Sequence, residues 1–394
     1  MRLLFLHEKL GAFGGAEANV LATAGELKAR GHSVALAHGS ATGRGEESWR
    51  TLFDALFPLE GGLGAAVAQF EPDVIFLHKL SDAAVLRELA GGEVPVVRMV
   101  HDHDLYCMRG YKYHYFTRAI CTRGASPYCL FPCGASIARA SGGGLPVRWV
   151  SYLAKRREIA LNRSFHRLIV ASGYMRDELL RNGFAAEQIE IHAPVPRPAG
   201  ASDRANFHPC NRIVYAGQII RGKGVDVLLE SLARVRTPFE CFILGDGSQR
   251  EECEDLSRRL GLGGRVHFAG FVPQSRVAEF YRDASLAVMS SLWPEPFGAT
   301  GLEAMRCGLP VVAFDAGGIK EWLLDGANGY LVPWMDRAAF AERVDQLLSD
   351  KLQAQRLGEA GRRLADERFS FNGYITGLED LFSRAAANTA VPTP

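Results

Sequence analysis

The sequence has almost no net charge and contains no long apolar run. Its 394 residues include 45 Lys or Arg and 44 Asp or Glu, which gives a formal net charge of +1. Such a balance provides no global attraction to nucleic acid or to a membrane surface. No apolar run approaches the length of about 18 residues that a spanning helix needs. The apolar start, residues 1–6, is too short for a signal peptide because His7, Glu8 and Lys9 follow at once. We therefore expect a cytoplasmic protein without a nucleic-acid partner.

Several familiar signatures are also missing. The N-terminal glycines Gly11, Gly14 and Gly15 do not spell the Gly-x-Gly-x-x-Gly fingerprint of dinucleotide binding, which argues against a dehydrogenase. No Ser-His-Asp or Cys-His set indicates a nucleophilic enzyme. No internal repeat of solenoid length is present.

What the sequence does contain is an alternation of apolar segments and helical patterns. Hydrophobic residues make up 47% of the chain, which is sufficient for two domains with cores of ordinary size. Strands are expected at residues 2–6, 33–37, 74–77, 94–100, 168–171 and 189–192, with a helix over 16–30. A second alternating series begins at residues 212–215. Strands that alternate with helices predict an α/β protein with parallel, doubly wound sheets.

The most informative segment runs from Glu295 to Ala304, where two carboxylates bracket a glycine-containing turn. Strands are expected before it, at 284–291, and after it, at 309–314, so the turn lies at the carboxyl end of a parallel strand. The following helix begins with unpaired, partly positive N–H groups that suit a phosphate. Glu295 and Glu303 would instead bind hydroxyls, because carboxylates are strong acceptors. The arrangement suggests a nucleotide sugar as ligand.

This spacing resembles the signature of the retaining GT-B glycosyltransferases of family 4 (glycosyl transferases group 1). Further segments fit the same family in the same order: residues 216–226 with Lys223, 244–247, 307–312 and 317–321, and, more loosely, 14–17 near the N-terminus. The resemblance covers most of the chain.

The resemblance implies a GT-B fold, in which two Rossmann-like domains face each other across a cleft. We expect an N-terminal acceptor-side domain over 1–195, a linker over 196–210 that is rich in Pro, Ala, Ser and Asn, and a nucleotide-sugar-binding domain over 211–370. The segment 371–394 is expected to form a helix that packs back on the first domain, followed by a frayed tail.

The implied activity is the transfer of a hexose-type sugar, with retention and without a metal ion, from a nucleotide diphosphate sugar to a glycan or lipid-linked acceptor, as in polysaccharide biosynthesis. The alternatives are an epimerase or phosphorylase on the same fold, and a catalytically silent nucleotide-sugar-binding protein. The resemblance implies catalytic roles for Lys223, Glu295 and His101. It implies donor binding by Gly15, Gln218, Arg221, Gly245, Phe297, Gly298, Ala299, Thr300 and Glu303.

Charge at the leaving diphosphate distinguishes this chain from its relatives. Negative charge grows there during transfer, and a fixed cation such as Lys223 lowers the barrier. The family usually places an arginine where this chain has Gln218, which carries no charge; Arg221 could compensate from a different position. His101 begins the segment His101-Asp102-His103-Asp104 and would line the acceptor side, although a polar residue at a strand end is an equally good interpretation. The Asp-x-Asp pair inside it is too short to indicate a metal site.

A cysteine-containing insert, residues 101–145, follows. Cys107, Cys121, Cys129 and Cys133 either form a structural zinc site or are separate buried thiols, since their spacing is not the paired Cys-x-x-Cys pattern. We expect the insert to influence acceptor choice. The segment 147–165 is expected to be a basic helix with an ordinary solvated face; the alternative is reversible docking on anionic lipid at the inner face of a membrane.

Overall fold

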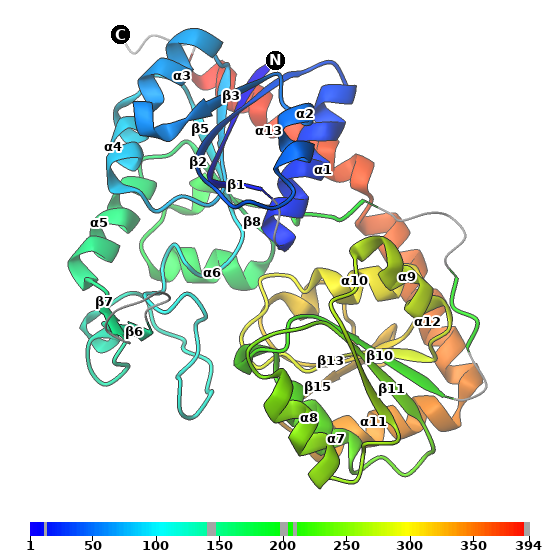
Figure 1. Ribbon diagram of the computed structural model, residues 1–394. Coiled ribbons are helices and arrows are strands. Elements are labelled where there is room, and N and C mark those ends of the chain that lie inside the picture. The colour runs from blue at the N-terminus through cyan, green and yellow to red at the C-terminus, as the bar shows by residue number, and fades with distance from the viewer. Residues whose placement is uncertain (12–13, 140–146, 198–203, 208–210, 390–394) are drawn as a thin grey trace. The chain divides into compact units, whose positions relative to one another are not determined.

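The chain forms two compact α/β units, which we describe separately. The structure is a computed structural model that describes all residues except 12–13, 140–146, 198–203, 208–210 and 390–394. The first unit comprises Met1–Lys112, Thr122–Pro196 and the segment from Phe371 onward. The second comprises Arg197–Ser370 together with Tyr113–Cys121, a short piece of the insert. Figure 1 shows both units, with the ribbon coloured by residue number from the N-terminus to the C-terminus.

The first unit is built on a seven-stranded sheet in the order β3-β2-β1-β4-β5-β8-β9, with every neighbouring pair parallel. The chain moves outward from β1 in one direction and then, through β4, in the other, so the sheet is doubly wound. The strands are β1 (Arg2–Leu10), β2 (Ser33–Ala41), β3 (Ala55–Pro58), β4 (Val74–Leu77), β5 (Val96–Val100), β8 (Arg167–Val170) and β9 (Ile189–Ile191).

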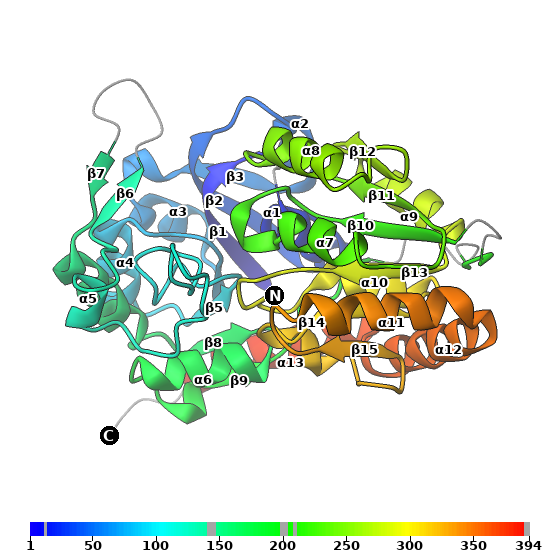
Figure 2. The same cartoon turned by 90° about the horizontal axis from the view of Figure 1, so that it is seen from below.

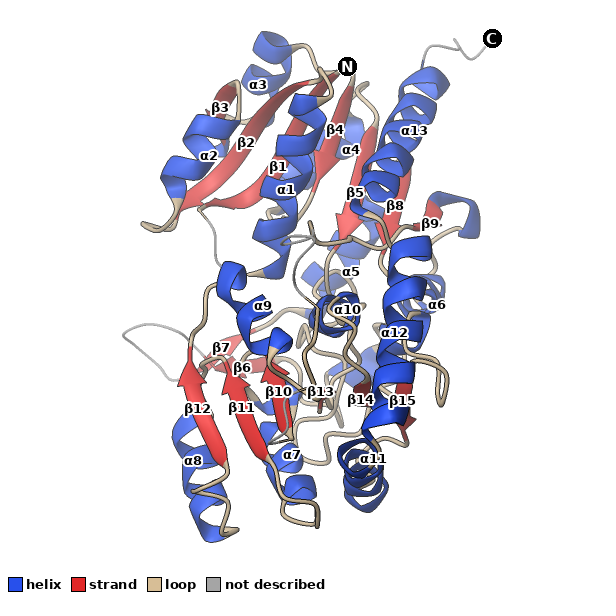
Figure 3. Ribbon diagram, turned by 90° about the vertical axis from the view of Figure 1, so that its right-hand side faces the viewer, coloured by secondary structure: helices blue, strands red, loops and turns tan. Residues whose placement is uncertain are grey.

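Seven helices accompany this sheet within its described residues, and Figure 3 shows them on both sides of the strands. Their side chains bury the apolar strands; Leu4, Leu6 and Leu77 are fully buried in this core. The last helix belongs to this unit, where Tyr374 stacks on His192 at a ring distance of 5.1 Å. The helices are α1 (Gly15–Ala29), α2 (Glu46–Leu52), α3 (Leu63–Phe70), α4 (Ala83–Gly91), α5 (Tyr152–Asn162), α6 (Gly173–Arg181) and α13 (Phe371–Thr389).

The second unit contains a six-stranded parallel sheet in the order β12-β11-β10-β13-β14-β15. The inner strands β13 and β14 are apolar and buried along their whole length, as expected for a parallel sheet covered on both faces. The strands are β10 (Arg212–Ala216), β11 (Glu240–Leu244), β12 (Val266–Gly270), β13 (Leu286–Met289), β14 (Val311–Phe314) and β15 (Gly329–Val332). The helices are α7 (Val225–Leu232), α8 (Arg250–Arg259), α9 (Gln274–Arg282), α10 (Ala299–Arg306), α11 (Arg337–Ser349) and α12 (Lys351–Arg368).

The fold class expected from the sequence is confirmed: both units are parallel, doubly wound α/β domains. One expected element is wrong. Residues 147–165 do not form a single helix, because Val147–Trp149 is instead strand β7, which pairs antiparallel with β6 (Ile137–Arg139). Helix α5 begins only after Ser151, whose hydroxyl accepts from the Ala154 amide at 3.2 Å and caps the helix.

Candidate active site

The loop that carries Lys223 leaves the carboxyl end of β10, a central strand of the second sheet. A short 3-10 helix, Arg221–Lys223, ends at Gly224, which adopts φ +64° and starts α7. A side chain at Gly224 would be strained, because its Cβ would lie 2.3 Å from the Ser290 carbonyl oxygen. The Ser290 hydroxyl donates to the Lys223 carbonyl at 2.9 Å, so the loop is attached to the segment after β13. The backbone therefore fixes where the Lys223 side chain starts.

Lys223 and Glu295, which lie 72 residues apart in sequence, form an ion pair. Lys223 Nζ lies 2.6 Å from Glu295 Oε1, and the Ser291 hydroxyl donates to the same oxygen. The ammonium also lies over the Trp293 ring, 5.2 Å from its centroid, where the ring face attracts a cation. The Lys223 side chain is 21% exposed and that of Glu295 only 4%, so the ammonium is the accessible partner.

The charge on Glu295 is maintained by its neighbours. Burial raises the pKa of this carboxyl, but the Lys223 ammonium and the Ser291 hydroxyl together lower it by more. The net pKa therefore lies below the ordinary value. Backbone pairing with the neighbouring loop holds the residue in place: the Glu295 amide donates to the Ala316 carbonyl at 3.1 Å, and the Gly318 amide donates to the Glu295 carbonyl at 2.7 Å. The carboxylate is therefore ionised and rigidly placed at neutral pH.

This pair gives a testable pH dependence. In the unfolded chain Glu295 should titrate at about pH 4.3, whereas its folded pKa is lower, so it stabilises the fold fully above that value. The contribution is lost as pH falls through the folded pKa. We expect the melting temperature of wild type to exceed that of Glu295→Gln by a constant amount above about pH 5, and the difference to shrink below about pH 4. A difference that stays constant or grows in acid would contradict the assignment.

The turn between Glu295 and α10 is held by a buried tryptophan. Gly298, at φ +84°, precedes α10, whose first residues are Ala299 and Thr300. The Trp322 indole donates to the Phe297 carbonyl at 2.7 Å. Phe297 is only 4% exposed, and its ring packs edge-on against Phe369 with the ring centres 5.6 Å apart. The first turn of an α-helix leaves backbone amides without intrahelical partners. In α10 these amides belong to the residues at the end of the segment 295–300.

Glu303 occupies the second turn of α10 and is partly exposed. Gly245 follows β11, also at the carboxyl edge of the sheet. It lies against Gly217, where the loop that carries Lys223 (the lysine loop) begins. A Cβ at Gly245 would lie 1.9 Å from the Gly217 carbonyl oxygen, so only glycine allows this approach. Gln218, which follows Gly217 in the chain, is exposed, and its carbonyl accepts from the Tyr215 hydroxyl at 3.1 Å. The structure thus brings ten of the expected site residues to one edge of the second unit: Gln218, Arg221, Lys223, Gly245, Glu295, Phe297, Gly298, Ala299, Thr300 and Glu303.

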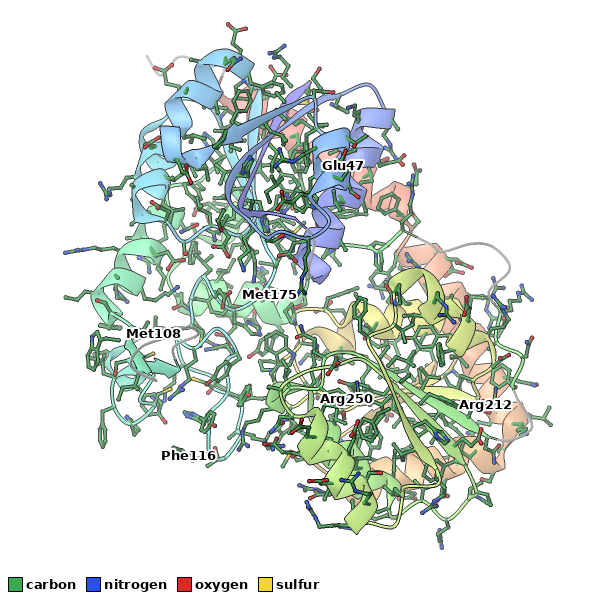
Figure 4. The ribbon with its side chains drawn as sticks, in the orientation of Figure 1. Glu47, Met108, Phe116, Met175, Arg212 and Arg250 are labelled. Atoms are coloured by element: carbon green, nitrogen blue, oxygen red, sulfur yellow. The ribbon has the colours of Figure 1, made fainter. Side chains whose placement is uncertain are left out.

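Arg221 is engaged by the insert segment Tyr113–Cys121 of the same unit. Its guanidinium lies 5.1 Å from the centre of the Tyr115 ring, and its Nε donates to the Tyr115 carbonyl at 3.2 Å. Three residues beyond Lys223, Asp226 forms a two-pronged pair with Arg118, at 3.1 and 2.6 Å. Phe116, labelled in Figure 4, is 88% exposed at the tip of this segment. The segment is therefore attached directly to the lysine loop and to the start of α7.

The other two expected site residues, Gly15 and His101, belong to the first unit. Gly15 begins α1, and a Cβ there would meet open space. His101 follows β5, and its Nε2 lies 2.8 Å from Nδ1 of His78, which follows β4. Burial lowers the pKa of His101 to about 3, so its ring is neutral at pH 7. Beside it, Asp102 pairs with Lys79 at 2.5 Å.

Of the two alternatives for the four clustered cysteines, the structural zinc site is not supported. Among the described residues, no three His, Cys, Asp or Glu side chains are gathered so as to hold a metal ion. Cys107, Cys129 and Cys133 belong to the first unit, whereas Cys121 belongs to the second. Burial raises the pKa of the Cys107 thiol above its ordinary value, so this thiol is protonated at pH 7. All four are free cysteines.

The sequence reasoning missed the residues that support the ion pair. Ser290, Ser291 and Trp293 all lie between β13 and Glu295, and each contacts the Lys223 loop or the Glu295 side chain. Two consecutive hydroxyls at the carboxyl end of a strand, four and five residues before a candidate acid, are a signal that could have identified the two serines. His78, the partner of His101, follows a strand in the same way.

Solved structures with the same architecture define the class of the fold. Anabaena HepE in complex with UDP and glucose matches with a TM-score of 0.72 and 20% identity, covering 98% of this chain and 100% of that one. Sucrose-phosphate synthase from Thermosynechococcus elongatus matches with a TM-score of 0.74 and 20% identity over the same shares. The protein therefore has the GT-B fold.

The family follows from sequence comparison. The profile described as Glycosyl transferases group 1 matches residues 203–364, and that of Glycosyltransferase Family 4 matches residues 13–194. The chain thus belongs to the family 4 (group 1) glycosyltransferases, as its motifs suggested.

Curated relatives match over part of their length. D-inositol 3-phosphate glycosyltransferase of Xylanimonas cellulosilytica is 34% identical over 177 residues, which are 44% of this chain and 42% of that protein. The lipopolysaccharide core biosynthesis glycosyltransferase LpsE of Rhizobium meliloti is 34% identical over 158 residues, 40% of this chain and 45% of that protein. The chain thus spans less than half the length of these two relatives.

Proposed function

We propose that this protein transfers a hexose-type sugar from a nucleotide diphosphate sugar to a glycan or lipid-linked acceptor, with retention of configuration and without a catalytic metal ion. The observation that carries the proposal is the Lys223–Glu295 pair, 2.6 Å apart, between the β10 and β13 loops of a domain that matches the group 1 glycosyltransferases. One loop supplies a cation for a diphosphate, and the other supplies a carboxylate for sugar hydroxyls.

The pair can serve both groups at once. An ammonium has three N–H donors, and Glu295 Oε1 uses one of those on Lys223, which leaves two for diphosphate oxygens. As the bond to the sugar breaks, charge accumulates on those oxygens, and the ammonium and the first amides of α10 stabilise it. The second oxygen of Glu295 would accept from a sugar hydroxyl, while Glu303 would accept from the ribose. Gln218 is uncharged, so Arg221 is the candidate for a second cation.

Retention without a protein nucleophile is consistent with a same-face route. The departing phosphate oxygen takes the proton of the acceptor hydroxyl as that hydroxyl attacks the anomeric carbon. With a pKa of about 3, His101 remains neutral at pH 7, so it would orient a hydroxyl by hydrogen bonding rather than contribute charge. The Gly15 backbone, free of a side chain, would leave room for the diphosphate.

The test has two stages. Thermal-shift measurements with UDP, GDP and ADP should first identify the base, because a ligand that binds only the folded state raises the melting temperature; UDP is tested first, since the HepE structure holds it. Nucleotide release from the matching sugar donors is then followed with and without acceptor sugars, in the presence and absence of chelator. Transfer to an acceptor with an unchanged anomeric configuration supports the proposal. Interconversion of donors, phosphate-dependent cleavage of a glycan, or binding without turnover would each replace it by one of the alternatives.

A further inference from the structure

Large apolar side chains that face solvent are concentrated in one part of the first unit. Among its described residues, six such side chains are exposed, and five of them occur between residues 130 and 153; only Ile191 lies elsewhere. The five are Leu130 at 40%, Phe131 at 85%, Ile137 at 53%, Trp149 at 74% and Leu153 at 65%. Single exposed apolar residues are ordinary, but a concentration of this kind marks an interaction site.

The β6–β7 hairpin brings two of these residues together, and a third follows at the start of α5. Ile137 and Trp149 are directly opposite each other in the antiparallel pair, so their side chains lie on the same face of the hairpin. The chain continues from Trp149 into α5, and Leu153 lies in the first turn of that helix. Figure 2 shows the hairpin at the end of the insert, leading into α5.

The exposed face of α5 adds positive charge next to this apolar group. Leu153, Arg156, Arg157 and Ala160 follow the three-, four- and seven-residue spacing of one helix face, and all four are exposed. Ile159, at the opposite side, is buried. We call Ile137, Trp149, Leu153, Arg156 and Arg157 the hairpin–helix surface.

The charge of the surrounding sequence has a single sign. Between Leu105 and Arg157 there is no Asp or Glu, whereas there are nine Lys or Arg, in a chain whose net charge is only +1. Within the described part of the chain, three of the nine form ion pairs: Lys112 with Glu178, Arg118 with Asp226 and Lys155 with Glu158. The positive charge beside the hairpin therefore rests on exposed residues such as Arg156 and Arg157. A partner for this surface must be anionic and must also accept apolar side chains.

We propose that the hairpin–helix surface docks the protein on a lipid bilayer that contains anionic phospholipid. Trp149 would occupy the interfacial region, where its amphipathic ring is favoured, with Ile137 and Leu153 beside it at the acyl boundary. Arg156 and Arg157 would attract the anionic headgroups. A soluble polyanion would use the arginines but would leave the aliphatic side chains of Ile137 and Leu153 in water, so a lipid surface fits the whole set better. The inference goes beyond glycosyl transfer, because docking requires neither donor nor acceptor.

The test measures vesicle binding of the full chain without any donor. At low salt, wild type should co-sediment with phosphatidylcholine vesicles that contain phosphatidylglycerol, bind less to phosphatidylcholine alone, and lose binding as salt rises. The double variant Trp149→Glu/Leu153→Glu should bind at least about tenfold more weakly. Arg156→Gln/Arg157→Gln should lose about fivefold per charge removed.

Matched controls come from the second unit, where Phe271 and Leu352 are each 79% exposed. The double variant Phe271→Glu/Leu352→Glu changes the charge by the same two units as Trp149→Glu/Leu153→Glu and removes comparable apolar area, so it should bind vesicles as wild type does. Trp149→Ser serves as the variant if the double substitution does not fold. Failure of wild type to bind at low salt, or equal binding by the hairpin–helix variants, would overturn the proposal. Stronger binding of heparin than of anionic vesicles, unaffected by Trp149→Glu/Leu153→Glu, would overturn it in favour of a polyanion.

Discussion

Replacing Lys223 with alanine is expected to lower kcat/KM for sugar transfer at least about 30-fold, equivalent to about 2 kcal/mol of transition-state stabilisation. Lys223 is the cation paired with Glu295, and its ammonium is the accessible member of the pair. Alanine removes the charge that the departing diphosphate needs. Steady-state kinetics with the donor identified by thermal shift would measure the effect, with Arg234→Ala, an exposed cation in the same unit, as the unaffected control.

A second variant separates the role of the ammonium from its effect on Glu295. Alanine at position 223 leaves the Glu295 carboxylate, 4% exposed, without its cation, and that alone could disturb the loop. The double variant Lys223→Ala/Glu295→Gln relieves this unpaired charge. If the ammonium acts on the diphosphate, the double variant is far less active than Glu295→Gln alone, although its melting temperature recovers. Recovery of activity, or a near-wild-type rate in Lys223→Ala, would contradict the assigned role.

The largest expected loss of stability comes from a buried ion pair at the base of the insert. Lys112 Nζ lies 2.8 Å from Glu178 Oε2, and the two side chains are 2% and 0% exposed. Lys112 also donates to the Arg123 carbonyl. The substitution Lys112→Met keeps the length of the side chain but removes the charge, and we expect it to lower the free energy of unfolding of the first unit by about 3 kcal/mol. Thermal or urea unfolding would measure this.

Two comparisons make the stability prediction specific. In Lys112→Met the buried Glu178 carboxylate keeps only one paired cation among the described residues, Arg181, which lies 2.5 Å from its Oε1 and is 41% exposed. Lys112→Met/Glu178→Leu removes the under-neutralised carboxylate and should recover most of the loss, because water can solvate Arg181 when Glu178 is absent. Arg236, which is 92% exposed and lies 3.8 Å from Asp345, is the contrasting case: Arg236→Ala should cost less than about 1 kcal/mol. Equal losses for Lys112→Met and Arg236→Ala would refute the argument.

The sequence was sufficient for the fold because its strands are local signals. Val74–Leu77 was expected as a strand and forms β4, and 212–215 differs from β10 by a single residue. Parallel strands buried on both faces are short apolar runs between helices, and these can be recognised without tertiary information. That Lys223 and Glu295 lie at one edge of the second unit could be predicted for the same reason, since each lies in the loop that follows a strand, β10 or β13.

What the sequence could not give depends on contacts between distant residues. Trp149 was expected in a helix, because the pattern from 147 onward is compatible with one; its pairing with Ile137, twelve residues earlier, makes it a strand. The four clustered cysteines share a stretch of sequence but not a compact unit, and spacing alone cannot reveal that. Lys112 and Glu178 are 66 residues apart, and nothing local marks either charge as buried.

The assignment of Tyr113–Cys121 to the second unit bears on how the protein can be divided. A fragment cut at the linker would begin near Arg197 and would leave behind Arg118 and Tyr115, the partners of Asp226 and Arg221. This fragment, the C-terminal half of the chain, would keep its sheet but would lose Arg118, whose charge neutralises Asp226 next to the lysine loop. Nucleotide affinity measured on the isolated half would therefore understate that of the intact chain, and chimaeras exchanged at the linker would need to carry the matching piece of the insert with them.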